Sequence, residues 1–216
     1  HLTNVSRIGK GEEVGLLDGS GGIYRGTVKD LNSGKVSVEL AERELAKDGF
    51  RPDLALAVIK GSRMDLAVEK CSEIGVGRII PFLCGRSVWR GRADKREAKR
   101  ERLQRKVISA CKQAVQPYFA QVETPVDFDR MLSITESYSA VILADSGGSP
   151  KARLPDDQCS VLGIVGPEGG FNDSEMEAMK DVGADTLSLG DFRLRSETAA
   201  ICLIYHIRYL SGAENG

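Results

Sequence analysis

The spacing of apolar positions changes near residue 52. Before it, short runs in which apolar and polar residues alternate lie at 13–17, 23–28 and 35–40, and the glycine-rich segment 18–22 separates the first two. Such runs are typical of strands joined by tight turns. We therefore expect residues 1–52 to form a small β-barrel or sheet. Pro52 marks its end, because proline disfavours helix in the residue before it.

In residues 53–216, segments with the apolar pattern of strands alternate with segments that have the apolar spacing of helices. Continuous apolar runs predict strands, and i, i+3/i+4 spacing predicts helices; in the longest helix Leu103, Val107, Ala110 and Ala114 form one apolar stripe. Strand and helix taking turns in this way predict an α/β fold with a mostly parallel sheet covered on both faces. The expected strands are 54–59, 78–83, 139–145, 161–165 and 185–189, and the expected helices are 62–74, 94–115, 173–182 and 198–210.

Composition narrows the class of protein. A chain of 216 residues with 41% hydrophobic content can bury the core of one or two domains. It has no run of about 18 apolar residues and no basic-then-apolar leader, so we expect neither a membrane span nor a signal peptide. The five cysteines include no C-x-x-C pair, which argues against a disulfide framework or zinc site and for a cytoplasmic protein without a metal. Because the chain begins with His1 inside the predicted first domain, we expect it to be incomplete at its N-terminus.

The distribution of charge is more informative than the net charge of −1. Residues 86–106 hold ten Lys or Arg against three acids, with Trp89 among them. Such a surplus could neutralise several phosphates of a nucleic acid. The alternative is a solvated helix face with internal ion pairs. Arg92, Arg96 and Arg100 are the candidate RNA contacts in this segment.

A glycine loop is the strongest local signal. Gly166–Phe171 follows the apolar run 161–165 and precedes a helix that begins near Asn172, with Glu175 at the spacing of a capping box. A second apolar run ends at Gly190. Glycines let the backbone approach a ligand, and the carboxyl ends of parallel strands form the crevice where ligands bind. Neither loop has a nucleotide-binding fingerprint, so the choice lies between a different small-molecule site and ordinary turns.

These loops resemble the signature of a known family. The segments Gly166-Pro167-Glu168-Gly169-Gly170, Leu189-Gly190 and Leu194-Arg195-Ser196-Glu197-Thr198-Ala199 are similar to those of SPOUT methyltransferases of the RsmE type. The likeness continues through Lys60–Asp65, Glu69–Val76 and Ile80-Pro81 and covers nearly the whole chain. Members methylate N3 of a uridine in 16S ribosomal RNA, using S-adenosylmethionine. The resemblance implies a trefoil-knotted α/β domain at 53–216, a PUA-like RNA-binding barrel at 1–52, and a homodimer acting on ribosomal RNA or the small ribosomal subunit.

The resemblance also implies roles for particular residues. Further candidate RNA contacts are Arg7, Lys60, Arg63 and Arg86. The last three could instead serve the acceptor pocket or form surface salt bridges. We expect the cofactor to lie against the two loops and an earlier strand end, which comprise Leu143, Gly166, Pro167, Glu168, Gly169, Gly170, Leu189, Gly190 and Leu194.

Two residues are candidates for the chemistry. The imide N3–H of uracil is a poor nucleophile until it loses its proton, so a base or a group that stabilises the pyrimidine anion is needed. Arg195 could stabilise that anion, and Glu197 is the nearest candidate base. Glu197 could equally be a helix N-terminal carboxylate that the helix dipole favours.

One position departs from the family pattern. Phe192 stands where the family usually has arginine, and Arg193 occupies the next, usually aliphatic, position. Two alternatives therefore stay open at this point. The protein could methylate another RNA position or a ribose hydroxyl, or it could be an inactive SPOUT-fold protein that binds RNA.

Overall fold

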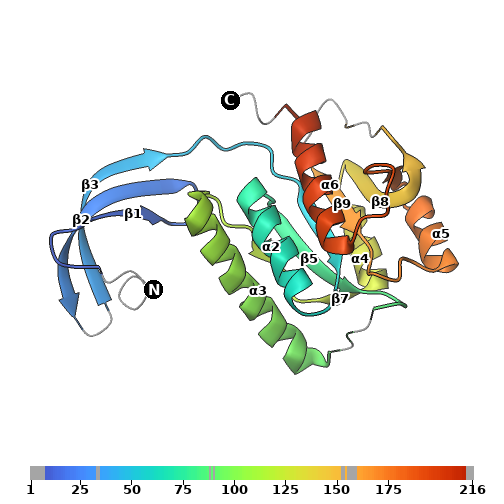
Figure 1. The fold of residues 1–216 in the computed structure, drawn as a ribbon, viewed down its shortest axis with the longest axis horizontal. Helices are drawn as coiled ribbons and strands as arrows, with labels where there is room; N and C mark the ends of the chain where they lie inside the picture. Colours follow the sequence, from blue (N-terminus) through green and yellow to red (C-terminus); the bar gives the residue numbers. More distant parts are fainter. Residues whose placement is uncertain are drawn as a thin grey trace.

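The computed structural model describes residues 8–32, 35–87, 89, 91–151, 154 and 160–212. Figure 1 shows a small sheet at one end of the molecule and a larger α/β unit at the other. Arg7, one of the expected RNA contacts, lies outside the described residues.

The small unit is an antiparallel sheet. Its strands β1 (Glu13–Leu17), β2 (Gly22–Asn32) and β3 (Lys35–Leu45) pair in the order β1-β2-β3. Within the described residues this is an open sheet rather than a closed barrel. Strands β2 and β3 extend beyond the predicted ends at 28 and 40. The end of β2 pairs with the start of β3, and the exposed polar end of β3 pairs with the start of β2.

The large unit contains the predicted parallel sheet. Its strands follow the order β10-β8-β9-β4-β5-β6, with β7 beside β5, and all pairings are parallel. The strands are β4 (Asp53–Ala57), β5 (Arg78–Leu83), β6 (Gln121–Val122), β7 (Val126–Asp127), β8 (Ala140–Ser149), β9 (Val161–Val165) and β10 (Asp185–Leu187).

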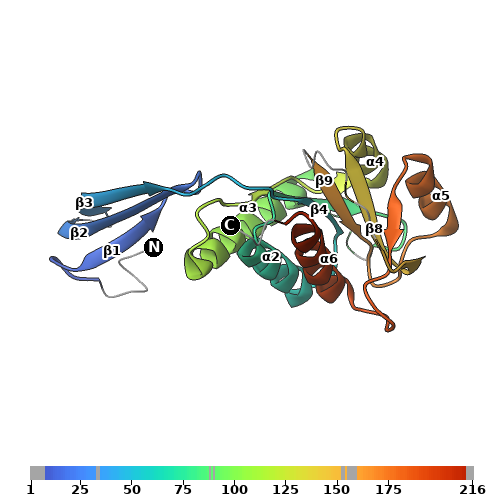
Figure 2. The same cartoon turned by 90° about the horizontal axis from the view of Figure 1, so that it is seen from above.

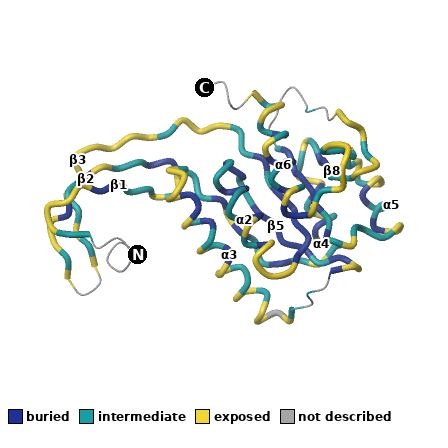
Figure 3. The backbone as a smooth tube through the Cα atoms, viewed as in Figure 1, coloured by how far each residue is buried: buried dark blue, intermediate teal, exposed yellow. Residues whose placement is uncertain are grey.

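Helices cover both faces of this sheet, as predicted (Figure 2). One core cluster packs α2 (Ser62–Ile74), α3 (Ala93–Ala114) and α6 (Ser196–Leu210) on the sheet through residues such as Met64, Leu103 and Leu203. The other packs α4 (Phe128–Thr135) and α5 (Asp173–Asp181) through Met131 and Met179. The tube in Figure 3 is accordingly darkest along the central strands. The trefoil knot implied by the resemblance stays a prediction.

The two units meet at the segment between α3 and β6. Gly21 N donates to Pro117 O at 3.1 Å, and Phe119 N donates to Gly19 O at 3.0 Å. Gly19 and Gly21 have φ of +82° and +101°, and the rings of Phe119 and Tyr118 occupy the space where their Cβ atoms would lie. Glycine is therefore required at both positions. Strand β3 ends at Leu45 and β4 begins at Asp53, so the predicted domain boundary at 52/53 falls at the end of the connecting segment.

Within the described ranges, no helix is both long and apolar enough to cross a membrane. Among the same residues, no group of three or more His, Cys, Asp or Glu side chains could hold a metal ion.

Candidate functional site

A cavity lies at the carboxyl edge of the parallel sheet. It has a volume of about 580 Å³. The loop after β9, the end of β8 and the long segment between β10 and α6 form its walls, which bring together residues more than 40 positions apart in the chain. The topology therefore places the two glycine-bearing segments at one site, as expected where parallel strands end side by side.

Most of the residues expected to bind the cofactor line this cavity. They are Gly166, Pro167, Glu168, Gly169, Gly170, Leu189, Gly190 and Leu194. Leu143 differs: its side chain is buried in the core cluster that holds α4 and α5, and the next residue, Ala144, lines the cavity. Phe171, the last residue of the glycine loop, also lines it, as do Asp145, Ser146 and Met176, which neither periodicity nor the glycine pattern singled out.

Three arginines hold the glycine loop in place. Arg63, at the start of α2, pairs with the Glu168 carboxylate at 3.2 Å. Arg86, in the loop after β5, donates to Gly169 O at 2.8 Å, and Arg193 donates to Glu168 O at 3.3 Å. The loop also closes on itself, since Gly170 N donates to Pro167 O at 2.9 Å. Arg63 and Arg86, which we expected at RNA, therefore also have a structural partner in the loop.

The glycines of the two loops differ in why glycine is needed, either for a backbone angle or to leave space for a neighbouring side chain. Gly170 has φ +69° and Gly190 has φ +142°, conformations that L side chains rarely adopt. A Cβ added at either would meet nothing within 4 Å, so both open toward free space. At Gly166, by contrast, a Cβ would lie 2.7 Å from the Phe171 ring.

The two candidate catalytic residues lie on opposite sides of the first turn of α6. Arg195, the N-cap residue, is exposed and lines the cavity, and it forms no ion pair in the described part of the chain. Glu197 is buried, with 6% of its surface exposed, and is absent from the cavity wall. Its Oε2 has no hydrogen-bond partner. The start of α6 thus presents a cation, and not a carboxylate, to the cavity.

One aromatic side chain at the rim of the cavity is unusually exposed. Phe192 lines the cavity mouth and is 84% exposed. Lys60, which precedes α2, is exposed and does not line the cavity.

Ion pairs occupy much of the basic segment. Arg96 contacts the Asp127 carboxylate at 2.7 Å, and Arg100 contacts Glu97 at 2.6 Å. Arg92 is exposed and has no ion pair among the described residues. Arg92, Arg96 and Arg100 were all expected to contact RNA. They therefore differ in how much of their positive charge is free to meet a phosphate.

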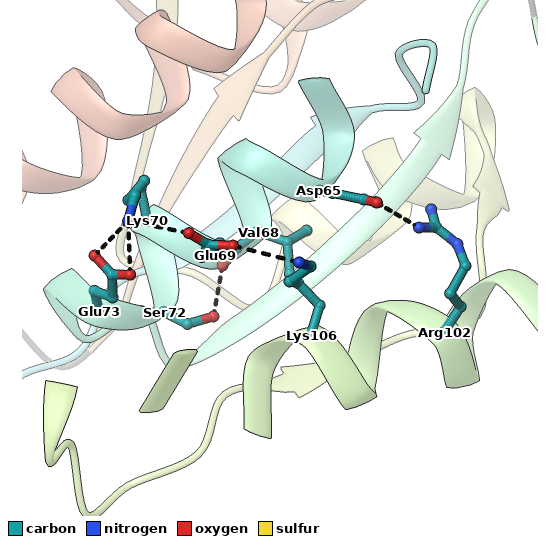
Figure 4. Close-up of polar contacts among 8 residues, drawn as sticks. All are labelled: Asp65, Val68, Glu69, Lys70, Ser72, Glu73, Arg102 and Lys106. Atoms are coloured by element: carbon teal, nitrogen blue, oxygen red, sulfur yellow. Dashed lines mark hydrogen bonds and ion pairs between the residues drawn. The ribbon is translucent and has the colours of Figure 1, made fainter. Parts of the chain in front are cut away.

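Further along α3, two basic side chains contact α2. Figure 4 shows Arg102 reaching Asp65 and Lys106 reaching Glu69, at 2.6 and 3.4 Å. Lys70 contributes a third cation, between Glu69 and Glu73. The ion pairs of Arg102 and Lys106 join α3 to α2, so this half of the basic segment stabilises the fold.

Models of known protein families match both the small sheet and the larger α/β unit. The model of an RNA methyltransferase domain matches residues 47–208, and that of an RNA methyltransferase PUA domain matches residues 1–41. The ribosomal RNA small subunit methyltransferase E of Aquifex aeolicus is 32% identical over 206 residues, which cover 93% of this chain and 86% of that protein. The enzyme of the same name from Mesomycoplasma hyopneumoniae is 29% identical over 151 residues, which cover 70% of this chain and 66% of that protein.

Solved structures extend the likeness to the arrangement of the chain. A methyltransferase from Legionella pneumophila in complex with its cofactor S-adenosylmethionine is 27% identical, with a TM-score of 0.89 over 97% of this chain and 87% of that one. A ribosomal RNA small subunit methyltransferase E from Neisseria gonorrhoeae, bound to S-adenosylmethionine, has the same coverage with a TM-score of 0.87 at 24% identity. On the extent of these matches, the chain belongs to the ribosomal RNA small subunit methyltransferase E family of RNA methyltransferases.

Proposed function

We propose that this protein transfers the methyl group of S-adenosylmethionine to N3 of a uridine in the RNA of the small ribosomal subunit. One observation carries the proposal: both glycine-bearing segments that mark the family line one large cavity at the carboxyl edge of the sheet. Relatives named for this activity match most of the chain. The same comparisons favour the enzyme over an RNA-binding protein that has lost catalysis.

The cavity suits the cofactor chemically. Leu187, Leu189 and Leu194 give it an apolar wall for an adenine ring, and the backbone at Gly170 and Gly190 is open to close approach. The Asp145 carboxylate lies on the same lining, where a cationic sulfonium and amino group gain from negative charge, whereas the Glu168 carboxylate is paired with Arg63. When bound, the cofactor supplies an electrophilic methyl group, and the protein must hold it in line with the acceptor and exclude water.

Arg195 is the residue we assign to the acceptor. Uracil N3 becomes nucleophilic as its proton leaves, and the negative charge then spreads to the flanking carbonyl oxygens. A guanidinium at the cavity wall, with no carboxylate partner in the described residues, can stabilise that charge. Glu197 lies behind the wall, so we assign it a positioning role at the start of α6 rather than the role of base.

RNA would reach this site across a basic rim. Arg63, Arg86 and Arg193 surround the glycine loop, and Arg92 and Lys95 extend the positive charge along α3. Exposed Phe192 at the mouth offers a ring on which an unstacked base can lie. From the proposed ribosomal RNA substrate we infer a cytoplasmic location.

A homodimer would cover the exposed face of α6. Tyr205 and Tyr209, four residues apart on that helix, are 49% and 62% exposed, and Leu210 is 38% exposed. Adjacent exposed apolar groups of this size are characteristic of interaction surfaces.

The test is transfer of labelled methyl groups to small ribosomal subunits from cells that lack the enzyme. Mass spectrometry of the digested nucleosides should find N3-methyluridine and no methylated ribose. Transfer to another nucleoside would refute the proposed reaction.

Variants at the start of α6 test the assigned roles. Under single-turnover conditions with saturating cofactor and RNA, Arg195→Ala should lower the rate by roughly 10²- to 10⁴-fold, and Arg195→Lys should restore part of it. Glu197→Gln, which keeps the shape of the side chain, should cost less than about tenfold. If Glu197→Gln lost as much rate as Arg195→Ala with unchanged cofactor affinity and thermal stability, Glu197 would be the base.

A further inference from the structure

A second cavity of about 330 Å³ lies beside the first at the same edge of the sheet. It is formed where β5 and β7 end and α4 begins, and its walls include Gly85, Trp89, Arg96, Asp127, Phe128 and Asp129. None of the functions assigned above uses it.

One short loop separates the two cavities. Arg86 lines the first cavity, whereas its neighbours Cys84 and Gly85 line the second. The loop is firmly held: Gly85 N donates to the Glu175 carboxylate at 2.6 Å, and Cys84 N donates to Ser87 Oγ at 3.0 Å. A polymer that places one unit in the first cavity can therefore place a neighbouring unit in the second.

The aromatic residues of the second cavity also connect it to the first. Phe128 lies 6.3 Å from Phe171, measured between ring centroids, and Phe171 lines the first cavity. Both rings pack against Phe82, so the partition between the cavities is an aromatic cluster. A flat ligand finds aromatic surface here in a partly enclosed site.

Trp89 is held at the opening by two neighbours. Lys99 Nζ lies 4.9 Å from the centroid of the indole ring, a cation–π contact. A Cβ on Gly91 would fall 1.9 Å from an indole carbon, so only glycine leaves room for the ring in this position. Arg96 fixes the same segment to the opposite wall, because it donates to Gly91 O, to Pro125 O and to the Asp127 carboxylate.

The carboxylates of this cavity remain able to accept hydrogen bonds. The guanidinium of Arg96 already donates its hydrogen bonds to residues around the cavity. The Asp127 carboxylate accepts from Arg96 yet is 68% exposed, and the exposed Asp129 carboxylate has no ion pair within the described ranges. A ligand for this site should therefore combine a flat ring with N–H donors.

We propose that the second cavity binds an unpaired guanine base of the substrate RNA, next to the nucleotide that is methylated. Guanine presents two adjacent donors, N1–H and the N2 amino group, which match a carboxylate, while its ring lies against Trp89 or Phe128. Uracil would set carbonyl oxygens against the same carboxylates. This inference rests on the proposed function, because it presumes an RNA substrate.

Trp89 provides the probe, since it is the only tryptophan of the chain. The full-length protein, saturated with S-adenosylhomocysteine to fill the first cavity, is titrated with guanosine or uridine 5′-monophosphate. Stacking near the indole should quench its fluorescence, and guanosine monophosphate should bind on the order of 5- to 100-fold more tightly than uridine monophosphate.

Two substitutions with matched controls locate the effect. Asp129→Asn should reduce the preference for guanine to within about threefold, whereas Asp94→Asn, at another exposed carboxylate in the first turn of α3, should leave it unchanged. Gly91→Ala should weaken binding because it displaces the indole, whereas Gly49→Ala, where a Cβ meets nothing within 4 Å, should not. In methyl transfer to small subunits, Asp129→Asn should raise KM for RNA and leave kcat within about twofold.

The outcomes separate this inference from the proposed function. Equal quenching by both nucleotides, or no effect of Asp129→Asn on base preference and KM, would overturn the guanine site even if methyl transfer is normal. A clear guanine preference without methylation of the small subunit would leave the base site in place and overturn the proposed reaction.

Discussion

At the level of residues, the three glycines of the loop after β9 meet different physical requirements. Gly166 makes room for the Phe171 ring, whereas a Cβ added at Gly169 would lie 3.4 Å from the Arg86 side chain, an ordinary contact distance. Gly170 alone has a left-handed backbone, with φ +69°. Within this loop, only the third glycine is therefore required for its backbone angle.

The first prediction concerns Gly170. Gly170→Val should lower the affinity for S-adenosylmethionine by at least about tenfold, because a β-branched residue in this conformation costs about 1–3 kcal/mol and its side chain would enter the open space of the cavity. Gly169→Ala, with no positive φ, is the control and should bind within about threefold of the parent. Calorimetry measures both. Parental affinity in folded Gly170→Val would mean that the loop does not contact the cofactor.

Residue roles were predictable from sequence only where they depend on the local chain. The glycine loops could be identified because their residues are contiguous. The partners of Arg63 and Arg86 lie 105 and 83 positions away, and nothing in the sequence connects them. The burial of Glu197 follows from how α6 rotates against the sheet, which its sequence alone does not fix.

At the level of elements, α3 divides its charge between the fold and solvent. Its C-terminal half pairs with α2 through Asp65 and Glu69. Near its N-terminus, Arg92 and Lys95 are exposed and have no ion pair within the described residues. The RNA contact predicted for the whole segment therefore concentrates at this end.

The second prediction follows from that division. Replacing Arg92 and Lys95 with glutamine should weaken RNA binding and reduce the slope of log affinity against log salt by about one to two, as expected when one or two phosphate contacts are lost. Arg100→Gln should change the slope less, because Arg100 already pairs with Glu97 at 2.6 Å. Filter binding over a series of salt concentrations measures the slopes. Equal slopes in the parent and the double variant would leave this end of α3 as a solvated helix face.

The third prediction concerns pH and the edge of the sheet opposite the site. Tyr138 donates to Asp53 and accepts from Arg78, both at 2.6 Å, which ties the start of β8 to β4 and β5. Burial, with the bond to Asp53, raises the pKa of Tyr138 above its ordinary value of 10.0. Because the folded state holds the phenolic proton more tightly, this contribution to stability is complete below pH 10 and is lost as the pH rises further.

Chemical denaturation between pH 8 and 11 tests this expectation. The parent should lose stability above pH 10 more steeply than Tyr138→Phe, which has no phenolic proton to lose. If the two proteins had parallel pH profiles, the Tyr138 hydroxyl would not be coupled to folding.

Elements were predictable in proportion to their length and burial. The strands 78–83 and 161–165 and the helix 62–74 agree with the structure residue for residue, because each has a clear period and clear end signals. Helix α4 and the two-residue strands β6 and β7 were missed, since so few residues give no measurable period. Strand β8 continues to Ser149 because β10 pairs with it there, a contact that comes from tertiary structure.

At the level of the whole molecule, the described residues leave an apolar face of α6 exposed. Tyr205, Tyr209 and Leu210 are exposed on a helix whose opposite side packs on α2 and the sheet. The same helix begins at Arg195, on the wall of the cavity. Assembly through this face would therefore be coupled to the geometry of the site.

The last prediction tests that coupling. Tyr205→Glu with Tyr209→Glu should convert a dimer into a monomer, because two carboxylates in an apolar interface would lose their hydration without gaining partners. Light scattering during gel filtration measures the mass, and single-turnover methyl transfer should fall along with dimer content. Leu45→Glu is the matched control, since Leu45 is 66% exposed but lies on β3 in the other unit. A parent that is monomeric at micromolar concentration, or a double variant that stays dimeric, would show that this face of α6 is not the interface. If the monomer kept the full rate, the site would be complete within one chain, and Arg195 would need no support from a partner.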